Sequence, residues 1–325
     1  MKLGNTELRY GLMLAPMAGF SDRGMRRVCH EEGAEYSVTE MISAKAVTYG
    51  DKKTFALAAI REDEGPVALQ IFGSEPEIMG KAASILSSPV PFPNTVAPAA
   101  IDINMGCPVH KIFSNGEGSA LMRDPQRVED IVSAVKELTP LPVTVKLRAG
   151  VTEDSLNAVE CALAAERGGA DLVTVHSRTR VQMYSGEVNM DIIKDVKSAL
   201  HIPVIANGDI TSGESAVRML RYTGADGVAV GRGAVGNPFI FREILSALTG
   251  ERYTEPTLAQ RVKAALNQLR LSVEDKGERC AVVEARKQIA AYLRSFHGAA
   301  LIRAEINRAT TYSEVESILL GIIKG

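Results

Sequence analysis

The 325-residue chain contains no tryptophan, aromatic residues make up only 5% of it, and it has just four cysteines. These cysteines, Cys29, Cys107, Cys161 and Cys280, are far apart and form no C-x-x-C pair. This spacing argues against a disulfide framework and against a structural zinc site, so we expect no bound metal. A cysteine with a chemical role would therefore act alone.

The sequence also lacks long hydrophobic runs. No stretch reaches the roughly 18 apolar residues that a membrane-spanning helix needs, and residues 1–7 lack the apolar segment of a secretory signal. The hydrophobic fraction of 46% and the charged fraction of 23% are those of an ordinary globular protein. We therefore expect a cytoplasmic, monomeric protein without membrane contact.

The formal net charge of −2 gives no basic signal for the chain as a whole. Residues 255–325, however, carry eleven Lys and Arg against eight Asp and Glu. This imbalance favours a phosphate-bearing partner for the C-terminal segment. A solvated helix face would look similar, so charge alone leaves both interpretations open.

Between residues 12 and 232 the sequence repeats one pattern: a short apolar run, a polar or glycine-rich turn, and a segment with helical periodicity. Runs that are apolar on both faces and alternate with helices indicate parallel strands. Eight of them predict closure into a (β/α)8 TIM barrel. The runs are Leu12–Pro16, Tyr36–Glu40, Val67–Phe72, Ala100–Gly106, Pro142–Arg148, Leu172–Arg178, Pro203–Asp209 and Gly227–Arg232.

The chain is expected to divide into a barrel domain, residues 1–250, and an all-helical domain, residues 251–325. A helix is expected from Asn237 to about Leu248, ended by the glycine at position 250. Ser313 is a candidate N-cap for the last helix. The helices predicted beyond Pro256 are Ala259–Lys276, Val282–Phe296, Ala299–Ala309 and Ser313–Ile323.

The turns after the seventh and eighth strands are glycine-rich. They read Asn207-Gly208-Asp209 and Gly231-Arg232. In many barrels these two turns bind a phosphate, because backbone N–H groups converge there and glycine permits close approach. Arg232 could add charge. The alternative is that the glycines only serve tight turns.

Two polar residues interrupt apolar strands at the expected mouth of the barrel. Lys146 lies within Val143–Arg148, and a buried lysine needs an anionic partner. That partner is either a ligand or a nearby carboxylate such as Asp102 or Glu40. Gln70 could hydrogen-bond a ligand, since an amide offers both a donor and an acceptor, or it could satisfy the backbone of the barrel.

Cys107 follows the fourth strand and precedes Pro108, in a loop whose backbone is constrained. An exposed, constrained thiol is a candidate acid or nucleophile, whereas the other three cysteines lie on predicted helices and are expected in the core. His176 and Arg178 are two residues apart on the sixth strand, so their side chains face the same way. They would form a cationic or hydrogen-bonding shelf opposite the Cys107 loop.

These motifs together resemble those of the tRNA-dihydrouridine synthases, most closely the bacterial B-type branch. The resemblance covers essentially the whole chain. The matching segments are Ala15–Asp22, Asp102–Pro108, Val204–Ile210, Gly227–Arg232 and Ala285–Leu293.

The resemblance implies an FMN enzyme that uses NADPH or NADH to reduce uridine to 5,6-dihydrouridine in the D-loop of tRNA. It implies that Cys107 donates the proton, that Asn104 and Arg178 lie near the target base, and that Arg286 and Lys287 contact RNA. The residues implied to hold FMN are Pro16, Met17, Ala18, Gln70, Lys146, His176, Asn207, Gly208, Asp209, Gly231 and Arg232.

The sequence departs from the family pattern at His110, where a second lysine is expected, which leaves the contact at that position open. Three alternative functions also remain. An FMN barrel acting on a free pyrimidine would not need the basic helical segment. An RNA-binding protein without catalysis would not need Cys107, Lys146 and the two phosphate turns. A flavin-free aldolase-type barrel is the third alternative.

Overall fold

The structure, a computed structural model, describes residues 1–294 and 298–324. Within these residues eight parallel strands pair in chain order, and the ring is closed where β11 pairs with β3 and where β4 pairs with β6. The predicted (β/α)8 barrel is confirmed. The strands are β3 (Leu12–Leu14), β4 (Tyr36–Val38), β6 (Val67–Phe72), β7 (Ala100–Asn104), β8 (Val143–Arg148), β9 (Leu172–His176), β10 (Val204–Asn207) and β11 (Gly227–Val230).

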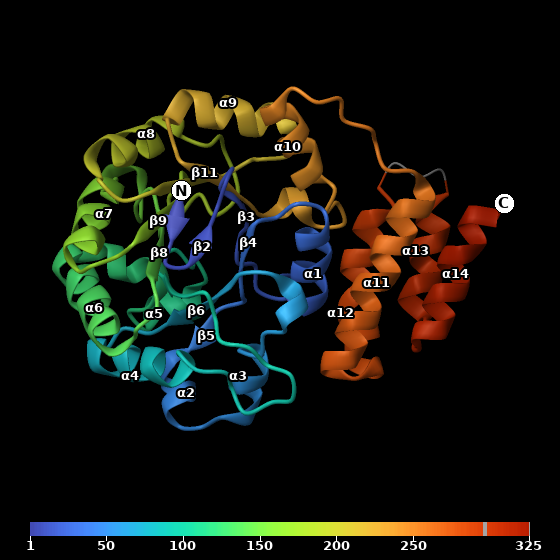
Figure 1. The fold of residues 1–325 in the computed structure, drawn as a ribbon, viewed down its shortest axis with the longest axis horizontal. Helices are drawn as coiled ribbons and strands as arrows, with labels where there is room; N and C mark the ends of the chain where they lie inside the picture. Colours follow the sequence, from blue (N-terminus) through green and yellow to red (C-terminus); the bar gives the residue numbers. More distant parts are fainter. Residues whose placement is uncertain (295–297, 325) are drawn as a thin grey trace.

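Helices surround the strands (Figure 1). None of the described helices combines the length and the hydropathy needed to cross a lipid bilayer. The longer ones are α1 (Arg23–Glu31), α4 (Pro76–Leu86), α6 (Pro125–Leu138), α7 (Ala158–Arg167), α8 (Met190–Ala199), α9 (Gly213–Thr223) and α10 (Ile240–Thr249). The shorter pieces are β5 (Ile42–Ser43), α2 (Ala44–Thr48), α3 (Lys52–Leu57), α5 (His110–Ser114) and the 3-10 turns Glu62–Glu64, Gly118–Arg123, Glu153–Ser155 and Arg232–Ala234.

An N-terminal hairpin, which the sequence did not predict, closes one end of the barrel. Its strands are β1 (Lys2–Leu3) and β2 (Thr6–Glu7), which pair antiparallel. Leu3 and Leu8 are buried in the same cluster as the first residues of three barrel strands, including Tyr36 and Leu172. The end at which the strands begin is therefore apolar and filled, and a binding site is confined to the other end.

Several predicted strands end earlier than expected, because their last residues leave the ladder and form loops. The run predicted as Pro203–Asp209 pairs only to Asn207, and Asp209 adopts a left-handed backbone with φ 46°. The run predicted as Ala100–Gly106 ends at Asn104. The predicted polar strand ends are thus the start of the βα loops, where barrel enzymes carry their chemistry.

The C-terminal segment is helical, as predicted. One predicted helix, Val282–Phe296, ends on residues outside the described ones. The predicted cap at Ser313 is wrong: Glu314 N donates to Thr311 Oγ1 at 3.3 Å, and Thr311 N donates to the Glu314 carboxylate. The helices are α11 (Leu258–Lys276), α12 (Glu278–Tyr292), α13 (Ala299–Arg308) and α14 (Tyr312–Lys324).

The hydrophobic side chains of these four helices form a cluster of their own, separate from the clusters inside and around the barrel. The segment 250–257 connects the two parts, close to the predicted division after residue 250. That division as two independent domains stays a prediction. Cys280 is exposed on α12, so its predicted place in the core is wrong, whereas Cys29 and Cys161 are buried on α1 and α7.

Helix α11 packs along α1 of the barrel, and the contact is close (Figure 1). Lys276 pairs with the buried carboxylate of Asp22 at 2.9 Å, and Ser272 donates to the same group. A side chain at Gly24 would place its Cβ 2.4 Å from the carbonyl oxygen of Gln268. Glycine is therefore required at this crossing.

Two matched substitutions test this contact. Alanine normally stabilises a helix relative to glycine by about 0.5–1 kcal/mol. At Gly321 on α14 the Cβ would meet nothing within 4 Å, so Gly321→Ala should raise the melting temperature slightly. Gly24→Ala should instead lower it, because the Cβ must push α11 away. Thermal unfolding measures both; an increase for Gly24→Ala would show that the crossing has room.

Candidate active site

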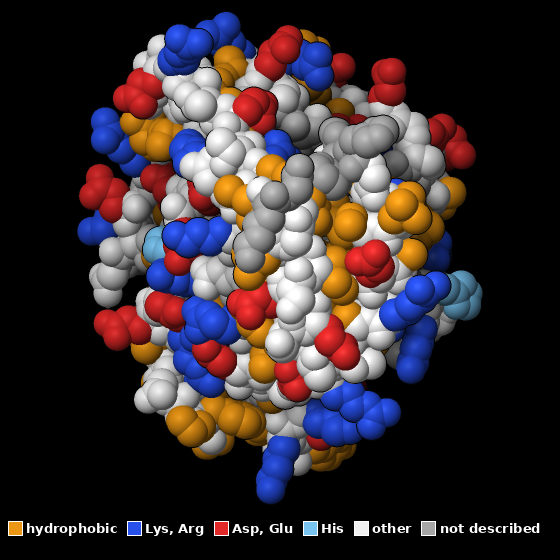
Figure 2. All heavy atoms as spheres, turned by 90° about the vertical axis from the view of Figure 1, so that its right-hand side faces the viewer, with side chains coloured by type: hydrophobic (Ala, Val, Ile, Leu, Met, Phe, Trp, Pro, Cys, Tyr) orange, Lys and Arg blue, Asp and Glu red, His pale blue; other side chains and the backbone are white. Residues whose placement is uncertain are grey.

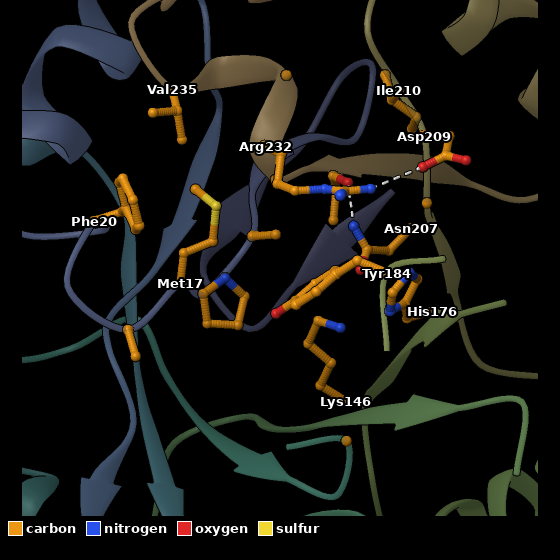
Figure 3. A pocket seen from close by; sticks show the side chains of 18 of the residues that line it. Met17, Phe20, Lys146, His176, Tyr184, Asn207, Asp209, Ile210, Arg232 and Val235 are labelled. Atoms are coloured by element: carbon orange, nitrogen blue, oxygen red, sulfur yellow. Dashed lines mark hydrogen bonds and ion pairs between the residues drawn. The ribbon is translucent and has the colours of Figure 1, made fainter. Parts of the chain in front are cut away.

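A cavity of about 820 Å³ opens at the carboxyl ends of the barrel strands. Its size falls in the range of small-molecule and cofactor sites. All eleven residues predicted to hold a cofactor line it, together with Asn104 and Cys107. Figure 3 shows Lys146, His176, Asn207 and Arg232 pointing into this common space, with Met17 facing them. Arg178, Arg286 and Lys287 are outside its lining.

Lys146 lines this cavity and has no carboxylate partner in the part of the chain that the structure describes. Among the described residues no carboxylate lies within 4 Å of its ammonium group, so the expected alternative of a pair with Asp102 or Glu40 is not formed. Glu40 instead accepts a hydrogen bond from Gly19 N at 2.5 Å. Burial, and then the charge of Arg148, lower the pKa of Lys146 to about 7. A lysine in this state suits an anionic ligand.

His176 lies beside this lysine and is neutral. Burial first, and then the surrounding cations Lys146 and Arg148, lower its pKa to about 2. It therefore offers one donor and one acceptor to the cavity and no positive charge. The sequence predicted either a cationic or a hydrogen-bonding role for His176 and Arg178. For His176 the lowered pKa excludes the cationic role and leaves hydrogen bonding.

Arg178 was predicted on the same strand face as His176, but β9 ends at His176, and Arg178 lies in the following loop and does not line the cavity. It is 2% exposed and makes a bidentate pair with Asp209, with N···O distances of 2.8 and 2.6 Å. It also donates to the carbonyl oxygens of Ser185 and Gly186. This hydrogen bonding holds the pKa of Asp209 below its ordinary value. Arg178 therefore joins the loops after β9 and β10.

The two glycine-rich turns form a compact end of the cavity. Gly208 has φ 141°, and a Cβ there would lie 2.7 Å from Val188. At Gly231 a Cβ would lie 3.8 Å from Met17 Sδ and 4.0 Å from Ala15 Cβ, in ordinary van der Waals contact, so the glycine leaves the space beside Met17 unfilled. Arg232 reaches across to Asp209 at 3.2 Å. Backbone, glycine and guanidinium are thus arranged as a phosphate group requires.

Cys107 lies at the rim of the cavity in a loop held by several hydrogen bonds. Its N–H donates to Asn104 Oδ1 at 2.9 Å, and its carbonyl oxygen accepts from Ser119 Oγ at 2.7 Å. The residue is only 8% exposed, so the expectation of an exposed thiol is wrong, and burial raises the pKa of this thiol. The thiol is therefore protonated at neutral pH and suited to donate a proton.

The structure adds residues that sequence reasoning missed. Tyr184, in the loop after β9, lines the cavity and stacks against Arg232 and Arg148, whose guanidinium carbons lie 4.9 and 5.8 Å from the ring centroid. Arg148 also donates to Gly106 O at 2.7 Å and to Thr179 O at 2.9 Å. The only signal in the sequence was the arginine at the end of the fifth strand.

Two further arginines, Arg261 and Arg294, reach the outer rim of the cavity from the helical segment. The two cations expected there, Arg286 and Lys287, are placed differently. Arg286 donates to Ala309 O at 2.9 Å, and Lys287 lies 4.2 Å above the Phe20 ring. Figure 2 shows that Lys and Arg side chains on the outer face of the helices are mixed with Asp and Glu.

Comparison with known proteins shows the family of the chain. The family model "Dihydrouridine synthase (Dus)" matches residues 13–323. The chain belongs to the dihydrouridine synthase family. It is 38% identical over 322 residues to the tRNA-dihydrouridine synthase B of Vibrio cholerae, covering 99% of this chain and 98% of that protein. The corresponding protein of Pasteurella multocida is 37% identical over 315 residues, covering 97% and 93%. The predicted resemblance to the B-type branch is confirmed.

The fold is also shared with a more distant structure, the histamine dehydrogenase from Rhizobium sp. 4-9. The TM-score is 0.56 at 13% sequence identity, over 83% of this chain. The chain spans half the length of that dehydrogenase. At this identity the likeness shows the barrel fold alone.

Lys146→Met tests the state of the lysine. In the unfolded chain a lysine has a pKa of about 10.4, whereas in the fold the pKa of Lys146 is about 7. Between these values the unfolded chain binds more protons, so stability rises with pH. Ligand-free Lys146→Met should therefore melt above the wild type near pH 7.

The difference in melting temperature between Lys146→Met and the wild type should narrow as the pH approaches 10. Lys263→Met, at an exposed position on α11, is the control and should show no such trend. Melting curves of the three proteins at pH 7, 8.5 and 10 give the answer. A difference that stays constant with pH would show that Lys146 is not a desolvated cation.

Proposed function

We propose that this protein is an FMN-dependent tRNA-dihydrouridine synthase, which reduces uridines in the D-loop of tRNA with NADPH or NADH. The observation that carries the proposal is the cavity itself. It combines an unpaired lysine, a compact glycine-rich end and a protonated thiol in one space. The relatives at 37–38% identity are named tRNA-dihydrouridine synthases, which supports the choice of substrate.

The residues of the cavity fit FMN. Gly208, Gly231 and Arg232 would hold its phosphate, because this end of the cavity offers backbone approach and a guanidinium. Lys146 would face the pyrimidine part of the ring, where a cation stabilises the negative charge of the reduced state. FMN bound here would supply hydride chemistry, with the nicotinamide nucleotide as the hydride source and carbon 6 of the uracil as the acceptor.

Cys107 would complete the reduction as the general acid. Its thiol keeps its proton at neutral pH because burial raises its pKa. It would give this proton to carbon 5 of the uracil, and Asn104 beside it would orient the base. The target uridine must leave its stack to enter the cavity.

The rim of the cavity favours an RNA over a free pyrimidine. Arg261 and Arg294 reach the rim from the helical segment, and Ala291 of α12 also lines it. Arginines at this place can neutralise backbone phosphates on either side of a flipped nucleotide. We propose this surface, with Lys287, as the path of the tRNA, and we expect a cytoplasmic monomer.

Dihydrouridine formation tests the function directly. The FMN-loaded protein should convert D-loop uridines of an unmodified tRNA to dihydrouridine when NADPH is supplied, as mapped by mass spectrometry. Free uridine and uracil should remain unreduced under the same conditions. Reduction of the free bases at the rate of tRNA would favour the pyrimidine dehydrogenase alternative, and a protein that retains no flavin would favour the RNA-binding one.

Cys107→Ala separates the two halves of the reaction. Flavin binding and flavin reduction by NADPH should be unchanged, because neither step needs the thiol. Reduction of tRNA should slow by about 10²-fold or more, the usual contribution of a general acid. Cys280→Ala, at the exposed cysteine of α12, is the control and should behave like the wild type. Normal tRNA turnover by Cys107→Ala would remove the assignment.

A further inference from the structure

A chain of side-chain hydrogen bonds runs under the cavity from Asp102 to the loop of Cys107. Gln70 Nε2 donates to Asp102 Oδ2 at 2.7 Å, and Asn104 Nδ2 donates to Gln70 Oε1 at 2.8 Å. Asn104 Oδ1 then accepts from the backbone N–H groups of Gly106 and Cys107, at 3.2 and 2.9 Å. We call these three side chains, Asp102, Gln70 and Asn104, the relay.

Both ends of the relay fix its direction. An ionised carboxylate can only accept hydrogen bonds, so Gln70 must turn its nitrogen toward Asp102. A backbone N–H can only donate, so Asn104 must turn its oxygen toward Cys107. The two demands meet at the central contact, where the nitrogen of Asn104 faces the oxygen of Gln70. Each amide is thereby held in one of its two possible orientations.

The relay is built on adjacent strands, which leave its members little freedom. Gln70 of β6 is paired in register with Asp102 of β7, and Asn104 of β7 with Lys146 of β8. Gln70, Asp102 and Asn104 are all buried. The backbone positions are therefore set by the barrel, and the orientation of the two amides is the remaining variable.

The carboxylate of Asp102 accepts a second hydrogen bond, whereas its burial disfavours the ionised form. Thr144 Oγ1 donates to its other oxygen, Oδ1, at 2.5 Å. Burial raises the pKa of Asp102 to about 6, against the hydrogen bonds from Thr144 and Gln70 and the charge of Lys146. The carboxylate therefore prevails at neutral pH, and its acceptor character is what the relay requires.

We propose that Asp102 is a positioning residue, which acts through Gln70 and Asn104 to hold the Cys107 loop in place for proton transfer. The consequence for the reaction rests on the proposed function, since it concerns the thiol that would protonate carbon 5. The effect of Asp102 on the position of the Cys107 loop does not depend on the proposed function. Loss of the acceptor at Asp102 frees Gln70 to turn its amide over, which removes the acceptor from Asn104 Nδ2 and loosens the Cys107 N–H contact.

The position of the loop can be read in the flavin-free protein from the alkylation rate of Cys107 by iodoacetamide, followed by mass spectrometry. Asp102→Ala should accelerate labelling about fivefold, the population change expected for the loss of one hydrogen bond. Asp102→Asn should restore the wild-type rate, because its oxygen can accept from Gln70 while its nitrogen donates to Thr144. Exposed Cys280 serves as the internal reference.

Two further variants separate the relay from general destabilisation. Gln70→Leu interrupts the relay at its centre without leaving a large void, and it should accelerate labelling as Asp102→Ala does. Thr144→Val removes the other hydrogen bond to the same carboxylate and should leave the rate unchanged. If Asp102→Ala fails to fold, the alkylation rates of Cys107 in Gln70→Leu and Thr144→Val still test the relay.

The same variants extend to the reaction. With Asp102→Ala, oxidation of the reduced flavin by tRNA should slow about tenfold, while flavin reduction by NADPH stays within about twofold. Asp102→Asn should recover most of the loss. Unchanged Cys107 labelling in both Asp102→Ala and Gln70→Leu would overturn the proposal, as would Asp102→Asn labelling as fast as Asp102→Ala. A wild-type protein that forms no dihydrouridine, with the labelling pattern intact, would refute the proposed function and leave the relay standing.

Discussion

The site depends on the closure of the parallel strand ring. Pairing of β11 with β3 and of β4 with β6 turns eight strands so that all their carboxyl ends meet at one mouth. Inside the ring the side chains are apolar where the strands begin, where Leu3 and Leu8 fill the space, and polar where they end. Residues as distant in sequence as Pro16 and Arg232 thus share one cavity because the ring closes, and for no local reason.

A charge that is largely removed from water and has no partner destabilises a fold, and the cavity contains one in the half-buried Lys146. The pKa of this lysine is lowered because the fold destabilises its charged form relative to its neutral form. Elsewhere near the mouth, charges are paired, as in the Arg178–Asp209 contact, or hydrogen-bonded, as in Arg148 and Asp102. Lys146 is the exception among these charges. A bound anion would neutralise it, and an unpaired charge of this kind is expected where a site is kept for function at the expense of stability.

The sequence predicted the barrel and eleven residues that line the cavity, because these follow from periodicity and from motifs near the strand ends, whereas several strands end earlier than predicted. It could not distinguish Lys146 from Arg178. Both were predicted on strands at the mouth of the barrel, yet only Lys146 lies on its strand. Arg178 lies in the loop after β9 and pairs with Asp209, and periodicity does not encode the path of these loops. The same holds for Arg294, which follows α12 and reaches the cavity because the helical segment packs against the barrel. The cap is Thr311, two residues before the predicted Ser313, because either hydroxyl could cap this helix and the sequence does not show which one does.

The helical segment is joined to the cavity by more than its rim arginines. Gln288 of α12 donates to Gly19 O at 3.4 Å, and Lys287 lies above the ring of Phe20. Gly19 and Phe20 belong to the loop after β3, the loop that also carries Met17 into the cavity. Since the other side of this loop is held by Glu40 through Gly19 N, its position reflects both the barrel and the helices. Helix α12, which carries part of the RNA path proposed above, is therefore in direct contact with a loop that forms the wall of the cavity.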